Sequence, residues 1–385
     1  MAVPTPIPVA AVGTGNVGKH ALKQLITDPR FELTAVWVSS EAKAGKDAAE
    51  LAGLLDSSGA TGSGVAGSGE TGIGETGIGE TGIVATTDLD AVLATKPVCI
   101  VYTAMADNRL PEALEDYRRI LAAGVNVVGS SAVFLQYPWQ VLPDELIAPI
   151  EDAAKEGSST IFVNGIDPGF ANDLLPLALS GTCQKIQQIR CMEIINYDTY
   201  DSATVMFDVM GFGRSIDDTP MLLQPGVLSL AWGSVVRQLA AGLSIELDEV
   251  TETHVRVPAP EDFDIAAGRI SKGTTAAMRF EVRGMKDGEV AVVLEHVTRL
   301  RDDLCPDWPR TAQPGGAYRV EIVGEPSYSL ELSLSSPNGD HNHAGLVATA
   351  ARLVNAIPAV ADAEPGIVTS LELPPITGKG LYAGR

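Results

Sequence analysis

The sequence predicts an α/β fold in which an N-terminal, doubly wound parallel sheet precedes an α+β part with a mostly antiparallel sheet. Three observations support this prediction. The apolar run Ile7–Val12 leads directly into a glycine-rich turn. Short apolar segments and helical segments then alternate up to Val163, a pattern typical of a parallel sheet. Beyond residue 185, longer strands separated by turn signals follow, and they indicate a second sheet of another kind.

The turn at residues 13–18 reads GTGNVG, lies between a strand and a helix, and has the spacing of a dinucleotide-binding turn. In such a turn Gly13 allows the tight bend, Gly15 lets a pyrophosphate approach the backbone, and Gly18 lets helix and strand pack closely. The N-terminus of the helix offers N–H groups to the phosphates. We therefore predict a Rossmann domain whose turn binds the cofactor through Gly13, Thr14, Gly15, Asn16, Val17 and Gly18.

The second strand, at residues 32–38, indicates which dinucleotide is bound. An NAD-binding unit commonly has Asp or Glu at the end of this strand to hold the ribose hydroxyls. Here Ser39 and Ser40 follow the strand, with Lys43 and Lys46 close by. Small hydroxyls and cations suit a 2′-phosphate, so we expect NADP, with NAD as the other possibility. The alternative interpretation is that both lysines are ordinary solvated charges.

The remaining elements of the first sheet follow in order. We expect helices at 47–55, 88–94, 110–123 and 143–156, and strands at 83–86, 98–103, Asn126–Gly129 and Thr160–Val163. Ligands of parallel sheets lie beyond the carboxyl ends of the strands. The strand ends at Thr103, Ala104 and Ser130 are therefore predicted to complete the cofactor site.

Residues 57–82 interrupt this pattern. They are rich in Gly, Ser and Thr, and three tandem Gly-Glu-Thr-Gly-Ile units occupy 69–73, 74–78 and 79–83. So little apolar content does not form a core, which indicates a flexible surface insertion. A small ordered platform at a subunit contact is the alternative.

The second part of the chain carries the antiparallel pattern. We expect strands at 186–196, 246–257, 276–284, 290–300, 318–323 and 327–335, and helices at 174–179 and 226–241. A last helix is predicted at 344–356, ending before Pro358. These elements divide the chain into a Rossmann domain at 1–135, a substrate and dimerisation domain at 136–343, and a C-terminal helix and tail at 344–385.

Composition restricts the partners. The 385 residues carry a formal net charge of −22, with 49 acidic and 27 basic residues, which argues against nucleic acid or an anionic membrane surface. We see no segment as long as a membrane span and no secretory leader. The four cysteines, at 99, 183, 191 and 305, lack metal-ligand spacing, so we expect free thiols, a cytoplasmic location and no metal.

Several segments together resemble the dihydrodipicolinate reductase-like family, and within it 2,4-diaminopentanoate dehydrogenase and the native amine dehydrogenases. These segments are GTGNVG, the strand end near Thr103, AGVNVVGSS, NGIDPGFANDLLP and ATAARLVNAIP. The resemblance implies a nicotinamide cofactor, hydride transfer at an imine or amine carbon of a small molecule, a homodimer, and a tail helix packed on the Rossmann domain. In those dehydrogenases, the segment after the strand that corresponds to Asn126–Gly129 carries a glutamate proposed to handle the proton and the ammonium. Residues 130–138 of this chain contain no carboxylate.

The loop at 164–173 contains the first candidates for the chemistry. Reduction of an imine or carbonyl needs a proton donor as well as a hydride. We predict Asp167 for this role and Asn164 and Asn172 as substrate contacts; an Asx turn at Asp167 is the alternative. Tyr137 is a second possible proton donor, although a Tyr-Pro-Trp run also suits a domain junction.

Other polar residues of the second part leave alternatives open. Glu193, Asp198 and Tyr200 fall in or just after its first strand and could face the cleft. We interpret His296 as a packed sheet residue, and His341 and His343 as a helix cap or cleft-lining residues. The sequence thus predicts an NAD(P)-dependent oxidoreductase acting on an amine, imine or carbonyl compound; the alternative is a non-catalytic NADP-binding sensor or scaffold.

Overall fold

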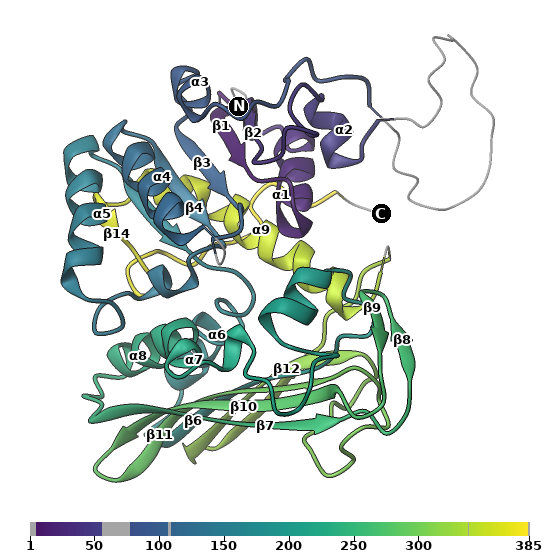
Figure 1. The fold of residues 1–385 in the computed structure, drawn as a ribbon. Coiled ribbons are helices and arrows are strands. Elements are labelled where there is room, and N and C mark those ends of the chain that lie inside the picture. The colour runs from purple at the N-terminus through teal and green to yellow at the C-terminus, as the bar shows by residue number, and fades with distance from the viewer. Residues whose placement is uncertain (1–4, 56–77, 107–108, 338, 384–385) are drawn as a thin grey trace.

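The computed structural model describes residues 5–55, 78–106, 109–337 and 339–383. The chain builds two six-stranded sheets, one in each half of the molecule, with helices on both faces of the first and on one face of the second (Figure 1). This confirms the predicted fold class.

The first sheet is parallel throughout. Its strands are β1 (Ile7–Val12), β2 (Phe31–Trp37), β3 (Cys99–Tyr102), β4 (Asn126–Gly129), β5 (Thr160–Val163) and β14 (Gly366–Ile367), in the order β14-β5-β4-β3-β1-β2. β1 lies between β2 and β3, so its carboxyl end, where the glycine-rich turn begins, faces the crevice formed by its two neighbours.

Helices cover both faces of this sheet. One face packs on α1 (Asn16–Thr27), α2 (Ala48–Ala52) and α9 (His341–Ala361), and the other on α3 (Leu89–Ala94), α4 (Leu110–Ala122) and α5 (Asp144–Gly157). The strands are buried on both sides, which explains their continuous apolar runs. The long α9 thus returns from the C-terminal part to the first sheet, with Leu353 and Ile357 fully buried against it.

The second sheet is mixed. Its strands are β6 (Lys185–Asn196), β7 (Glu249–Pro258), β10 (Thr275–Lys286), β11 (Glu289–Arg299), β12 (Gly316–Glu325) and β13 (Tyr328–Leu332), in the order β13-β12-β6-β11-β10-β7. All neighbours are antiparallel except β6 and β11, which run parallel. A small hairpin of β8 (Phe263–Ile265) and β9 (Gly268–Ile270) lies apart from the sheet.

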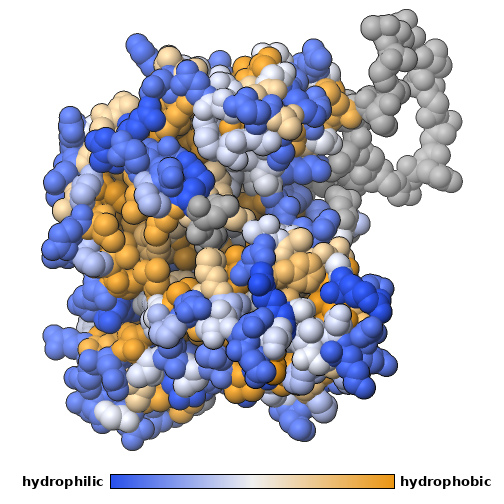
Figure 2. Space-filling view, in the orientation of Figure 1, coloured by the Kyte–Doolittle hydropathy of each residue, from blue (hydrophilic) through white to orange (hydrophobic). Residues whose placement is uncertain are grey.

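Short helices lie between the second sheet and the first half. They are α6 (Leu174–Ser180), α7 (Val227–Ala231) and α8 (Gly233–Gly242), and their apolar residues join the core of the second sheet (Figure 1). Within the described residues, no helix covers the opposite face of this sheet. Figure 2 shows apolar residues gathered where the two halves of the molecule meet, on an otherwise mainly hydrophilic face.

Some predicted boundaries are wrong. The helix expected at 226–241 is interrupted at Trp232, and residues 83–86 form only isolated bridges. α9 begins at His341 and continues through Pro358 to Ala361, because a proline in the last turn removes only one hydrogen bond of the helix. α9 is therefore long and apolar enough to span a membrane by length and composition, contrary to the expectation that no segment is. Its apolar face is used instead for packing on the parallel sheet.

The predicted insertion at 57–82 falls largely outside the described residues. Its last residues are described, and they are attached to the Rossmann half. Ile78 N donates to Leu54 O at 3.0 Å, and the Asp47 carboxylate accepts from Thr81 N at 3.1 Å and Gly82 N at 2.8 Å. Asp47 also caps α2 through Ala49 N, so one carboxylate joins the helix start to the end of the insertion.

Candidate functional site: a pocket between the two halves

A cavity of about 490 Å³ opens at the carboxyl ends of β1, β2, β3 and β4. The glycine-rich turn, the end of β2 and the loops after β3 and β4 form its Rossmann side. Tyr200, Asp201, Ser202 and Val205 close it from the second half, and Leu346 of α9 completes the wall. The pocket therefore lies between the two halves, where the sequence predicted the ligand.

The three glycines of the turn have different surroundings. Gly13 has a φ of +99°, and a Cβ there would lie 2.5 Å from Ala104 N. A Cβ on Gly18 would lie 2.3 Å from Gly13 O and 2.6 Å from the Thr103 hydroxyl. A Cβ on Gly15 would meet no atom within 4 Å, because this position faces the open pocket. Gly13 and Gly18 thus serve packing, and Gly15 leaves space for a ligand.

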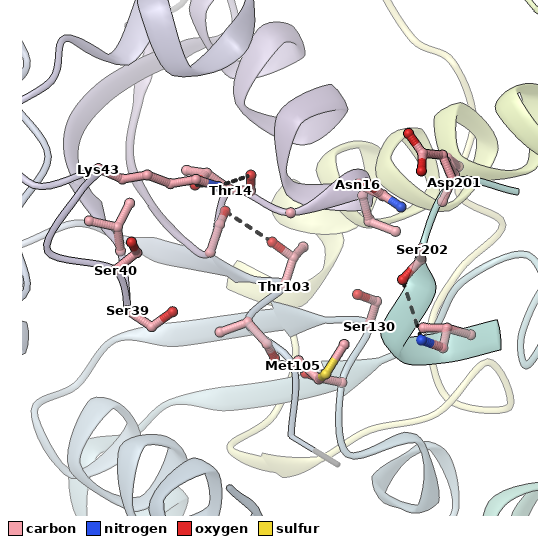
Figure 3. A pocket seen from close by; sticks show the side chains of 18 of the residues that line it. Thr14, Asn16, Ser39, Ser40, Lys43, Thr103, Met105, Ser130, Asp201 and Ser202 are labelled. Atoms are coloured by element: carbon pink, nitrogen blue, oxygen red, sulfur yellow. Dashed lines mark hydrogen bonds between the residues drawn. The ribbon is translucent and has the colours of Figure 1, made fainter. Parts of the chain in front are cut away.

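One end of the pocket carries hydroxyls and a cation. Ser39, Ser40 and Lys43 line it, and Lys43 Nζ donates to Thr14 O at 3.1 Å and to Thr14 Oγ1 at 3.2 Å (Figure 3). The lysine therefore lies across the turn, beside the two serines. No carboxylate lines this end among the described residues.

The opposite end is built by both halves. Figure 3 shows Ser130 of the Rossmann side opposite Ser202 of the second half, with Asp201 on the side of Asn16. Asp201 is the one acidic residue among the described residues that line the pocket. Val205 belongs to a π-helical turn, Thr204–Val209, a local geometry that is frequent at functional sites.

The structure places most of the predicted cofactor residues in this cavity. Those that line it are Gly13, Thr14, Gly15, Asn16, Val17, Ser39, Ser40, Thr103, Ala104 and Ser130. Gly18 lies behind the turn. Asn164, Asp167, Asn172 and Tyr137 are not among its lining residues.

Asp167 lies in a buried polar network. Its Oδ1 accepts from Asn172 Nδ2 at 2.6 Å and from Trp232 Nε1 at 3.1 Å, and lies 3.5 Å from His296 Nε2. Asn172 Oδ1 in turn accepts from Gly169 N at 2.8 Å, so its side chain joins two parts of the loop. The predicted catalytic role of Asp167 stays a prediction, and the predicted substrate contact of Asn172 likewise.

His296 connects this loop to the second sheet. Its Nδ1 lies 3.1 Å from Glu193 Oε2, which also accepts from Tyr197 OH at 3.0 Å. Burial alone would lower the pKa of His296, but the two carboxylates raise it to about 10. The imidazole is therefore protonated at neutral pH, and it lies between the carboxyl groups of Asp167 and Glu193.

Sequence reasoning missed this cluster. The sequence around His296 predicts a packed sheet residue, and its ring does stack on Phe280 with ring centroids 4.6 Å apart. Its carboxylate partners lie 129 and 103 positions earlier in the chain. Glu193 becomes its neighbour only through the parallel pairing of β6 with β11, which no local pattern encodes.

Asn164 contacts a second buried carboxylate. Its Nδ2 donates to Asp173 Oδ2 at 2.8 Å, and its Oδ1 accepts from Arg352 Nε at 2.9 Å. Ser370 Oγ donates to the same Asp173 oxygen at 2.6 Å, and Asp173 also caps α6. Both polar atoms of the Asn164 amide thus have partners inside the protein. Its predicted contact with a substrate stays a prediction.

Tyr137 lies elsewhere. It lines a separate cavity of about 350 Å³ with Gln140, Arg237 and Leu247, and its ring contacts Trp139 edge-on at 5.0 Å. Burial, and then the nearby Glu372, raise the pKa of Tyr137. This position matches the alternative interpretation of a residue at the junction, and its role as a proton donor stays a prediction.

Comparison with known proteins agrees with this architecture. Residues 170–379 match the family model of the 2,4-diaminopentanoate dehydrogenase C-terminal domain. The chain is 39% identical over 365 residues to an amine dehydrogenase of Streptomyces virginiae, covering 94% of each chain. It is 24% identical over 283 residues to 2,4-diaminopentanoate dehydrogenase of Acetoanaerobium sticklandii, covering 73% of this chain and 75% of that one.

Among solved structures, the amine dehydrogenase of Mycobacterium smegmatis superposes with a TM-score of 0.74. It is 22% identical, and the match covers 96% of this chain and 97% of that chain. This similarity shows that the two proteins share one fold over nearly their whole length.

Proposed function

The chain belongs to the family of the amine dehydrogenases and 2,4-diaminopentanoate dehydrogenases, and we propose that it oxidises a small primary amine, or forms it from a carbonyl compound and ammonia, with NADP(H) as the cofactor. The family makes the chain an NAD(P)-dependent dehydrogenase. The amine substrate is inferred from these relatives, an amine dehydrogenase and a 2,4-diaminopentanoate dehydrogenase.

The single observation that carries the proposal is the space in front of Gly15. The fully open position of this glycine at the N-terminus of α1 matches a cradle for a pyrophosphate, because a side chain there would occupy the ligand's volume. When bound, the nicotinamide supplies or accepts the hydride. The chain's own residues bind and orient it: the turn at the phosphates, and the loops after β3 and β4 at the other end of the pocket.

NADP is proposed over NAD from the chemistry at the end of β2. A 2′-phosphate would meet the hydroxyls of Ser39 and Ser40 and the ammonium of Lys43. NAD-binding units commonly place an acid there, which would repel that phosphate. Charge-assisted hydrogen bonds of this kind typically contribute about 1.5–3 kcal/mol.

The experiment that tests the proposal measures cofactor turnover with a panel of ketones plus ammonium, and with the matching amines in the oxidative direction. NADPH and NADH are compared at equal concentrations. Ammonium-dependent oxidation of NADPH with at least one ketone is expected. Tight cofactor binding without turnover of any amine, imine or carbonyl compound would favour the sensor or scaffold alternative.

The face of the second sheet that no helix covers among the described residues is the surface we propose for a homodimer. Val255 of β7 and Val323 of β12 are about half exposed, and Val255 pairs in register with Arg279, which forms ion pairs with Glu295 and Glu281 on this sheet. Two exposed apolar residues on a sheet face that also carries ion pairs suit a self-complementary contact. Light scattering of the wild type and of Val255→Glu tests the dimer: the variant should be monomeric.

The four cysteines are free thiols, which is consistent with the cytoplasmic location that we propose.

A further inference from the structure

A smaller side pocket of about 220 Å³ adjoins the cofactor pocket at the end opposite Lys43. The two cavities share Asn16, Tyr200, Asp201 and Leu346 as lining residues. The remaining wall comes from Thr199 and from the N-terminus of α9, namely Asp340, Asn342 and His343. A group held here would therefore lie next to whatever occupies the end of the cofactor pocket.

Two polar side chains of the wall, Asn342 and Thr199, donate their hydrogen bonds within the protein. Asn342 Nδ2 donates to Asn196 O at 2.9 Å and to Thr199 Oγ1 at 2.7 Å. Because the carbonyl of Asn196 is an acceptor only, the orientation of the Asn342 amide is fixed. The Thr199 hydroxyl in turn donates to Asp340 Oδ2. This chain of bonds runs in one direction and ends on a carboxylate.

The same wall carries oxygen acceptors, which come from Asn342 and from two aspartates. Asn342 is only 7% exposed, and its Oδ1 has no hydrogen-bond partner among the described residues. A buried carbonyl without a donor is costly, so a partner is expected for it. Asp340 and Asp201 add two carboxylates to the same cavity. Burial alone would raise the pKa of Asp340, but bonds from Thr199 and from backbone amides at the start of α9 lower it, so Asp340 carries its charge at neutral pH.

We propose that this side pocket binds a primary ammonium group. Such a group carries three N–H donors and one positive charge, and it meets the unpartnered carbonyl of Asn342 and the carboxylates of Asp201 and Asp340. Asp201 is the one acid that lines both cavities among the described residues. His343 is the one basic side chain in the described wall of the pocket, and its ring contacts His20 at 4.9 Å.

The inference deepens the proposed function, on which its meaning for catalysis rests, because either reactant could bring the ammonium group. It can be the free ammonium ion that supplies the nitrogen in the reductive direction. It can equally be a second ammonium group on the substrate, at a distance from the reacting carbon. Both sources offer the same chemistry to Asn342 and the two aspartates, and two kinetic measurements distinguish them.

Binding is tested without turnover. The melting temperature of the NADP-saturated protein is measured against methylammonium chloride, with tetramethylammonium chloride as the control cation without N–H donors and sodium chloride as the ionic-strength control. Methylammonium should stabilise the wild type more than tetramethylammonium does. Asp201→Asn and Asp340→Asn should each raise the half-effective methylammonium concentration roughly tenfold or more, since a charge-assisted bond is lost. Asn at position 340 still caps α9, so the helix is preserved.

The matched control is Asp217→Asn, which removes an exposed acid outside the described wall of either pocket and should leave the response unchanged. An equal effect of the two organic cations, or an unchanged response in both pocket variants, would overturn the inference.

Two kinetic measurements then identify which reactant brings the ammonium group. A raised KM for ammonium in Asp201→Asn, with the ketone KM unchanged, shows the free ion. A selective loss of kcat/KM for propane-1,3-diamine over propylamine shows the second ammonium group. If no amine is turned over at all, the proposed function fails while the binding result still decides the subsite.

Discussion

Asp167 Oδ1 and His296 Nε2 lie 3.5 Å apart in the interior, where both side chains are about 95% buried or more. The pair joins the loop after β5 to the middle of the second sheet, and Glu193 holds the other side of the imidazole. Removing one partner of a buried ion pair typically costs about 3–5 kcal/mol, because it leaves an uncompensated charge.

We therefore expect Asp167→Asn to lower the free energy of unfolding by roughly 3 kcal/mol. Urea denaturation of the two proteins at pH 7 measures this loss. The variant also decides the catalytic prediction for Asp167. If it unfolds like the wild type while turnover falls by at least ~10²-fold and NADP(H) affinity is kept, Asp167 acts in proton transfer. If stability falls and the remaining folded enzyme keeps its turnover, its role is structural.

The raised pKa of His296 predicts a pH dependence of stability. The pKa of the folded state, about 10, lies above the ordinary value of 6.5, so the proton binds the folded protein more tightly. The stabilisation is complete below about pH 6.5 and is lost as the pH rises towards 10. The free energy of unfolding should thus fall between pH 7 and pH 10, and this slope should be smaller in Asp167→Asn. An identical slope in both proteins would contradict the assignment to His296.

Ser39→Asp tests the cofactor preference. A carboxylate at this position would repel a 2′-phosphate and could hold the ribose hydroxyls of NAD, so we expect the preference to move from NADP(H) towards NAD(H). Lys43→Ala should weaken NADP binding by about tenfold and leave NAD binding nearly unchanged. Lys46→Ala is the matched control, because Lys46 pairs with Glu50 and does not line the pocket. Tighter binding of NAD(H) than NADP(H) by the wild type would refute the proposal.

Two alanine substitutions in the glycine-rich turn should affect different properties, one the binding of cofactor and the other the stability of the fold. Gly15→Ala places a methyl group in open space, so the protein should melt normally but bind cofactor at least about tenfold more weakly. Gly18→Ala forces a Cβ to within 2.3 Å of Gly13 O, so the melting temperature should fall markedly. Melting curves and cofactor titrations of both variants separate the ligand cradle from the packing contact.

The insertion can be tested in two steps. Deleting residues 57–77 and joining the ends with a short Gly-Ser linker should leave the melting temperature nearly unchanged, because loop closure depends only weakly on length. Deleting 57–82, which the sequence alone predicts to be harmless, should now destabilise the protein. The longer deletion removes Thr81 and Gly82 from the Asp47 carboxylate. Equal stability of the two deletions would show that these bonds contribute little.

The sequence predicted the Rossmann half better than the polar interior, for a physical reason. The predicted bounds of the strands at Asn126–Gly129 and Thr160–Val163 agree with the structure, because both faces of these strands are buried and the apolar run is continuous. Most of the residues predicted to bind the cofactor line one cavity, because they lie in turns at the ends of neighbouring strands, which a local pattern can locate. The contact of His296 with Glu193 depends on pairing between strands about a hundred residues apart, and the contact of Asn342 with Thr199 depends on how α9 meets the second half. Neither contact produces a pattern of hydrophobic residues that could be recognised in the sequence.

The bonds around Asp173 join three distant segments on one side of the interface between the halves. Asn164 from the loop after β5, Ser370 from the tail and Gln238 from α8 all converge on one carboxylate oxygen. This cluster is buried, whereas the cofactor pocket opens to solvent between the glycine-rich turn and Asp201. Any motion that widens the pocket to admit or release a dinucleotide must leave the cluster intact or break several bonds at once. Separating the two halves at Asp173 would therefore cost the bonds from Asn164, Ser370 and Gln238 together.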